Sequence, residues 1–85
     1  DIGSVQVDLD TQLPWWRQLS PNRQLVLADM AFNLGIVRLK GFRKALEAMQ
    51  AGAWAEAASQ MLDSTWAKQV GKRAEMLANM MKGTI

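Results

Sequence analysis

The residues best suited to acid–base chemistry in this chain are its carboxylic acids. They are Asp1, Asp8, Asp10, Asp29, Glu47, Glu56, Asp63 and Glu75. Hydrolysis of a glycosidic bond, for example, needs two carboxyl groups that face each other across a cleft. Asp8 and Asp10 point to different sides of a helix, and the three glutamates fall on the polar faces of predicted helices. The residues alone therefore indicate no catalytic constellation, and we interpret these acids as solvated or ion-paired.

The composition disfavours metal, thiol and phosphate chemistry. The chain has no histidine and no cysteine, which removes the usual general base, the commonest metal ligands and any disulfide. The glycines are scattered as predicted helix stops and form no phosphate-binding loop. We therefore predict no bound metal and no cofactor.

A cluster of positive charge, Arg38, Lys40, Arg43 and Lys44, lies in a chain whose net charge is +2. A solvated helix face is the simpler interpretation, and attraction to an anionic polymer is the alternative. The cluster lacks neighbouring aromatic residues suited to base stacking, so we predict no nucleic-acid partner. No run of about 18 apolar residues exists, so we also predict no membrane span.

The tryptophans are candidates for stacking on a sugar or for the core. Trp54 and Trp66 occur at helical spacing, which favours the core. The neighbouring Trp15 and Trp16 cannot both face one core, so stacking remains open for this pair. A buried Trp66 needs an acceptor for its indole N–H, and the side chain of Asn33 is a candidate.

The first 13 residues allow two interpretations. Val5, Val7 and Leu9 alternate with polar residues, as in a strand, whereas Ile2, Val5, Leu9 and Leu13 share one helical face. No other segment is a candidate strand for pairing, so we favour a helix that ends before the proline at position 14.

The remaining chain predicts an all-α fold, a compact bundle of short helices around one buried central helix. The predicted helices are Trp15–Leu19, Pro21–Leu34, Ile36–Lys40, Phe42–Ala51, one from near Ala53 with a further turn carrying Trp66, and a last one that follows a break at Gly71 and ends at Lys82. The segment 21–34 is apolar nearly all round, which is typical of a buried helix. Arg73 lies beside the Gly71 break, where it can project toward whatever packs on that end, although a surface arginine is the simpler interpretation.

Five segments carry a resemblance through their order and spacing. They are DMAFNLG at 29–35, GFRKAL at 41–46, GAWAEAA at 52–58, MLDSTWA at 61–67 and QVGKRAEMLANMM at 69–81. In this order the chain resembles the C-terminal helical lobe of the phage-type lysozymes, glycoside hydrolase family 24. The segment LPWWRQLSPNR at 13–23 also resembles the endolysin branch found in phages and prophages of Gram-negative bacteria.

This resemblance implies roles for five residues that support a site without being catalytic. Phe32 and Asn33 match positions on the floor of the substrate cleft, and Phe42 matches a hydrophobic position along the same wall. Trp66 matches a tryptophan that is hydrogen-bonded to the residue matched by Asn33. Arg73 matches an arginine that forms an ion pair with the catalytic glutamate.

The resemblance also implies a division of labour. Residues 1–13 are expected to end an interlobe helix and residues 14–85 to form the helical lobe, while the catalytic glutamate, aspartate and threonine are expected upstream of Asp1. The parent enzyme is expected to be made in the host cytoplasm and to cleave β-1,4 bonds of peptidoglycan at the bacterial periplasm and cell wall. The chain alone is then expected to be inactive, with the missing lobe or a second copy of itself as partner. The alternative is a non-catalytic helical module that binds the cell wall or another protein.

Overall fold

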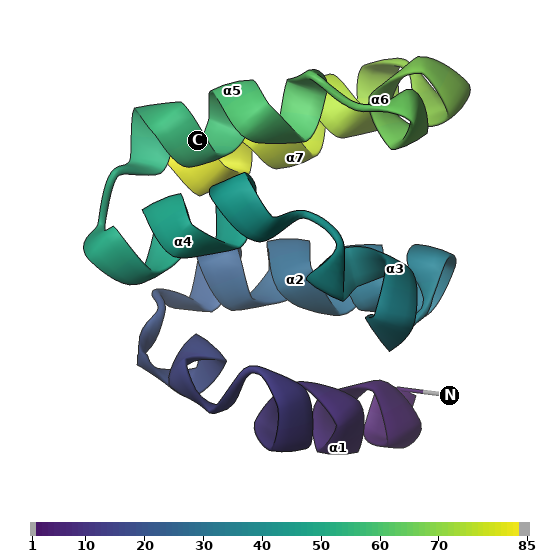
Figure 1. Cartoon of the computed structure of the whole chain (residues 1–85), viewed down its shortest axis with the longest axis vertical. Coiled ribbons are helices and arrows are strands. Elements are labelled where there is room, and N and C mark those ends of the chain that lie inside the picture. The colour runs from purple at the N-terminus through teal and green to yellow at the C-terminus, as the bar shows by residue number, and fades with distance from the viewer. Residues whose placement is uncertain (1, 84–85) are drawn as a thin grey trace. The chain divides into compact units, whose positions relative to one another are not determined.

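The computed structural model describes residues 2–83, and these residues are almost entirely helical (Figure 1). In chain order the elements are α1 (Ile2–Gln12), the 3-10 helix η1 (Pro14–Gln18), α2 (Pro21–Leu34), α3 (Ile36–Lys40), α4 (Arg43–Ala51), α5 (Trp54–Leu62), α6 (Thr65–Val70) and α7 (Lys72–Lys82). No strand occurs between positions 2 and 83, so the predicted all-α class is confirmed. The chain divides into two compact units, with the boundary between Gly41 and Phe42.

The burial pattern of α1 decides between the two interpretations of its sequence. Val5, Leu9 and Leu13 are buried, whereas Val7 is 63% exposed. A strand would place Val5, Val7 and Leu9 on the same face, so this pattern is that of a helix. The helix ends at Gln12, because Pro14 begins η1 and disfavours helical geometry in the residue before it.

α2 begins and ends as its sequence predicts, but it is buried along one face only. The Ser20 hydroxyl oxygen accepts a hydrogen bond from the Arg23 backbone N–H at 3.4 Å, and Gly35, with a φ of 83°, follows the last turn. The buried residues are Val26, Leu27, Met30 and Ala31. Leu25 and Phe32 are each 59% exposed, so the predicted all-round burial is wrong for this face. Within its unit, α2 is covered only by the shorter elements α1, η1 and α3.

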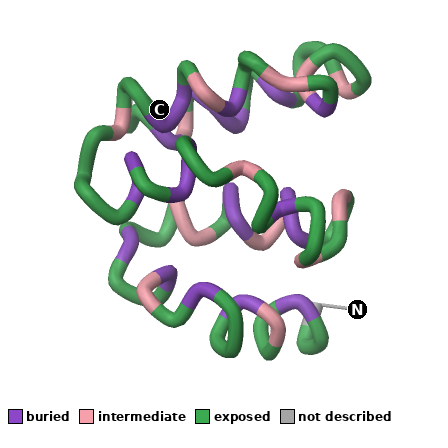
Figure 2. Tube along the Cα trace, viewed as in Figure 1, coloured by how far each residue is buried: buried purple, intermediate pink, exposed green. Residues whose placement is uncertain are grey.

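The second unit is built on α5, which packs against both α4 and α7 (Figure 1). Figure 2 shows buried positions recurring along these helices. Six of the buried residues of this unit are alanines, and we call four of them the alanine seam: Ala57 and Ala58 on α5, and Ala74 and Ala78 on α7. Side chains this small let two helices approach closely, while Met61, Leu77 and Met81 fill the remaining space.

Local signals set the start of α6 and the break before α7. The Ser64 hydroxyl donates to the Met61 carbonyl at 2.7 Å and accepts from the Ala67 N–H at 3.1 Å, which caps the helix that carries Trp66. Gly71 has a φ of 58° and a ψ of −118°, a conformation that glycine adopts without strain, and it separates α6 from α7. No helix among the described residues is long and apolar enough to cross a bilayer.

Candidate functional site

Phe32 and Asn33 lie side by side in the last turn of α2, and both are exposed. The Asn33 amide nitrogen donates to the Asp29 backbone carbonyl at 2.9 Å and to the Asp29 carboxylate at 2.5 Å. This pair of bonds holds the Asn33 amide against Asp29, which lies one turn earlier in α2. An exposed aromatic ring beside an oriented amide is the kind of mixed surface that binds sugars, since the ring contacts apolar C–H groups and the amide pairs with hydroxyls.

Phe42 and Trp66 are brought into contact in the second unit. Their rings meet edge to face, with centroids 6.0 Å apart and planes at 82°. Trp66 is only 4% exposed, so its interpretation as a core residue is confirmed. Phe42 is half-buried at the N-terminal cap position of α4, where its contact with Trp66 ties the start of that helix to α6.

The indole N–H of Trp66 is buried and has no hydrogen-bond partner among the described residues. Leaving a buried donor without an acceptor costs about 1–3 kcal/mol. Asn33, the acceptor expected from the sequence, belongs to the first unit, and this pairing stays a prediction.

Arg73 lies in the first turn of α7 and is exposed. The residue before it, Lys72, lines a shallow groove of about 380 Å³ together with Leu62, Ala67, Lys68, Gly71 and Glu75. Glycosidic cleavage by two carboxyl groups is not a property of this groove, because Glu75 is the one acid in its lining.

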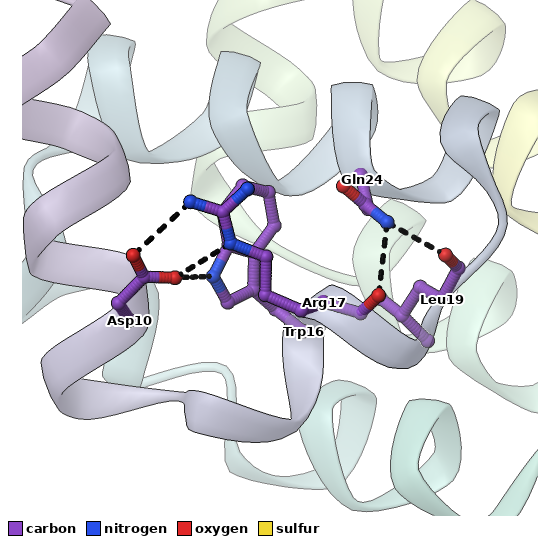
Figure 3. A network of polar contacts seen from close by, with 5 residues as sticks. All are labelled: Asp10, Trp16, Arg17, Leu19 and Gln24. Carbon is purple, nitrogen blue, oxygen red and sulfur yellow. Dashed lines mark hydrogen bonds and ion pairs between the residues drawn. The ribbon is translucent and has the colours of Figure 1, made fainter.

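A network of hydrogen bonds joins Asp10 of α1 to two residues of η1, and the sequence did not predict it (Figure 3). The Trp16 indole N–H donates to Asp10 Oδ1 at 2.7 Å. Arg17 donates from Nε to the same oxygen at 2.8 Å and from Nη2 to Oδ2 at 3.1 Å. The Arg17 guanidinium also lies over the Trp16 ring, 4.7 Å from its centroid. We call this set of contacts the Asp10 clamp.

The Asp10 clamp sets the charge of its carboxylate. The hydrogen bond from Arg17, then that from Trp16, lowers the pKa of Asp10 from 3.8 to about 2. A general acid needs a raised pKa, so that it still carries a proton near neutral pH. Asp10 is therefore placed to hold structure and not to protonate a leaving group.

The lowered pKa of Asp10 predicts an acid-sensitive stability. Because the folded-state pKa lies below the unfolded value of 3.8, the ionised carboxylate stabilises the fold above pH 4, and this stabilisation disappears as the pH falls toward 2. Asp10→Asn should remove that part of the pH dependence. Urea denaturation between pH 2 and pH 6 checks this, with Asp8→Asn as control. Equal pH slopes for Asp10→Asn and the unaltered chain would contradict the assignment.

No group of three or more acids that could hold a metal ion occurs in the described residues. Asp1, one of the acids considered from the sequence, lies outside them. Of the residues predicted for the site, Phe32 and Asn33 are neighbours in the first unit, and Phe42 contacts Trp66 in the second. The Asp10 clamp is a further polar cluster, which the sequence did not predict.

Comparison with known proteins addresses the resemblance directly. A probable T4-type lysozyme 2 of Dictyostelium discoideum is 34% identical over 71 residues, which cover 82% of this chain. A probable T4-type lysozyme 1 of the same organism is 28% identical over 71 residues. The chain resembles the T4-type lysozymes. The resemblance expected from the order of the five segments is thereby confirmed, over a part of the lysozyme length.

The lysozyme-like chain spans only 42% of the length of each of these two relatives. It also matches the pre-baseplate central spike protein of Enterobacteria phage T4, with 34% identity over 77 residues, which is 87% of the chain and 13% of that protein. No protein-family model matches the chain, and no solved structure matches it significantly.

Proposed function

We propose that this chain is the helical C-terminal lobe of a lysozyme that hydrolyses the β-1,4 bonds of bacterial peptidoglycan. The observation that carries the proposal is the partial match: 82% of the chain aligns with 42% of a T4-type lysozyme. In this proposal α1 is the end of an interlobe helix, and residues 14–85 form one wall of the substrate cleft. The enzyme is made in the host cytoplasm and acts on the wall from the periplasm.

The exposed end of α2 supports a role in the cleft. Phe32 is 59% exposed although burial of an aromatic ring is strongly favourable, and Asn33 is held in place by Asp29. In the proposed enzyme these side chains face the glycan, and Phe42 extends the same wall. Arg73 pairs with the glutamate of the catalytic lobe, and Trp66 supports the wall from behind.

The chain alone is then catalytically silent. The acid whose protonation the structure constrains, Asp10, is held ionised by Arg17 and Trp16. Losing a general acid typically lowers the rate by ~10²–10⁴-fold, and losing the opposite wall of the cleft lowers it further.

Clearing of purified Gram-negative peptidoglycan, followed by turbidity, tests the proposal. The 85-residue chain is compared with a longer protein that includes the upstream coding region. We expect only the longer protein to clear the suspension. Clearing by the short chain would overturn the assignment of the acid, and glutamine variants of Glu47, Glu56 and Glu75 would then locate it. Clearing by neither protein would overturn the proposed function.

The second candidate is a non-catalytic module that binds the cell wall. The observation that favours it is the exposure of all four basic residues of the cluster, Arg38, Lys40, Arg43 and Lys44. This candidate requires the chain to co-sediment with insoluble peptidoglycan and to lose that binding when Arg43 and Lys44 are replaced by glutamate. The lysozyme proposal requires no such charge dependence.

A further inference from the structure

The C-terminal half of α1 is fastened to two other elements of its unit. Asp10 binds Trp16 and Arg17 of η1. Two residues on, the Gln12 side-chain oxygen accepts a hydrogen bond from the Lys40 ammonium of α3 at 2.8 Å. The apolar side of the same half is buried through Leu9. Polar and apolar contacts therefore both anchor this end of the helix.

Residues 3–7 of α1 are mostly exposed. Gly3, Ser4, Gln6 and Val7 are exposed, and Val5 is buried. The contacts of the C-terminal half of α1 with η1 and α3 therefore set the direction of the whole helix.

Asp10 does not stabilise α1 itself. A carboxylate in the last turn of a helix faces the negative end of the helix dipole, which is unfavourable. The charge is compensated from outside the helix, by the paired N–H groups of Arg17. The residue is therefore better explained by the corner that it closes than by the helix that carries it.

The corner between α1 and α2 is braced on its other side as well (Figure 3). The Gln24 amide nitrogen, from α2, donates to the backbone carbonyl of Arg17 at 3.1 Å and to that of Leu19 at 2.8 Å. Pro14 and Pro21 fix φ at the start of η1 and of α2. Side-chain bonds and proline rings together leave this corner few soft torsions.

We propose that Asp10 and Arg17 are positioning residues that lock the corner between α1 and α2, so that the segment joined to the N-terminal end of α1 is held at a fixed angle to the Phe32–Asn33 face. The inference rests on the proposed function for the identity of that segment, the catalytic lobe. The locked corner itself is a property of the 85-residue chain and is testable there.

The first test measures the corner directly in the chain. The sequence has no cysteine, so Gln6→Cys on α1 and Leu25→Cys on α2 carry two spin labels without interference. We expect a single narrow distance distribution between them, and a broad one after Asp10→Asn at unchanged helical circular dichroism. Asp8→Asn removes the same charge from the same helix and should leave the distribution narrow.

A second variant keeps this test decisive if Asp10→Asn fails to fold. Arg17→Lys keeps the positive charge but loses the planar group that bonds both carboxylate oxygens, and it should also broaden the distribution. A narrow distribution in every folded variant of Asp10 and Arg17 would overturn the proposal.

The second test uses the longer protein that carries the upstream lobe. With soluble glycan-strand fragments, Asp10→Asn should lower kcat by roughly 10- to 100-fold, the range expected when reacting groups are displaced by about 1 Å, with little change in KM. Rates are taken well below the melting temperature of each variant, so that a stability defect alone does not lower kcat. Unchanged kcat with a broadened corner would overturn the positioning role. A longer protein that does not cleave at all would overturn the proposed function and leave the first test standing.

Discussion

Replacing Arg73 by alanine, in a protein that also carries the upstream lobe, is expected to lower the rate of peptidoglycan clearing by about 10²-fold, a loss typical of removing a group that orients the reacting partners. Arg73 is exposed in the first turn of α7, on the surface of its unit. In the proposed enzyme it pairs with the catalytic glutamate and fixes that side chain against the scissile bond. The measurement is the initial slope of turbidity loss at equal enzyme concentration.

Two further variants separate orientation from charge. Lys72→Ala removes a neighbouring exposed cation from the same turn and should leave the rate within about 2-fold, because an isolated surface charge contributes little. Arg73→Lys keeps the charge but not the planar, paired hydrogen bonds, so it should restore only part of the activity. An alanine variant that clears at the unaltered rate would show that Arg73 has no role in the site.

Replacing Leu77 by alanine should lower the free energy of unfolding by about 2–5 kcal/mol, the range found for large-to-small changes in packed cores. Leu77 is 2% exposed and lies on α7, which packs against α5. Because α5 and α7 already pack closely at the alanine seam, they cannot move much closer together to fill the cavity left by the smaller side chain. Because small domains are stable by only about 5–15 kcal/mol, the variant should lose a large share of its stability.

Urea denaturation followed by circular dichroism gives the change in stability caused by Leu77→Ala. The matched control is Met76→Ala, since Met76 is the preceding residue of α7 and is 46% exposed. That change should stay within about 0.5 kcal/mol, as surface substitutions usually do. Similar losses for the two variants would contradict the packing of α7 described above.

The helix boundaries follow from short-range chemistry and were therefore predictable. Ser20 and Pro21 start α2 at the expected residue, and Gly35 and Gly71 end helices where the sequence indicates. Each of these signals acts within about one turn of helix, through a cap, a missing N–H or a positive φ. The choice of helix for α1 needed one long-range argument, the absence of any strand to pair with.

The face of α2 that is exposed was not predictable from its own sequence. Leu25 and Phe32 belong to a helix that is apolar nearly all round, and periodicity does not say which apolar face remains uncovered. That depends on the length and path of the neighbouring elements. The Asp10 clamp was not predictable for the same reason, because the path of the chain through Pro14 and η1, which carries Trp16 and Arg17, decides whether these residues meet Asp10.

The candidate site shows a similar division. Trp66 was assigned to the core from its spacing, and its burial confirms that. Its edge-to-face partner, Phe42, was predicted as the first residue of a helix and instead occupies the N-cap position of α4, and periodicity does not say which ring it contacts. The proposed roles of Phe32, Asn33 and Arg73 came from the order of the five segments and not from any property of the residues alone.

The alanine seam restricts how the second unit can drift in sequence over evolutionary time. At Ala57, Ala58, Ala74 and Ala78 a glycine weakens the helix by about 1 kcal/mol, and a larger side chain overpacks the core around α5 and α7. Neither a smaller nor a larger side chain is therefore tolerated well at these positions, whereas exposed neighbours such as Ala55 accept substitutions more readily. We expect distant descendants of this chain to keep the four alanines even after most of the exposed residues around them have been replaced.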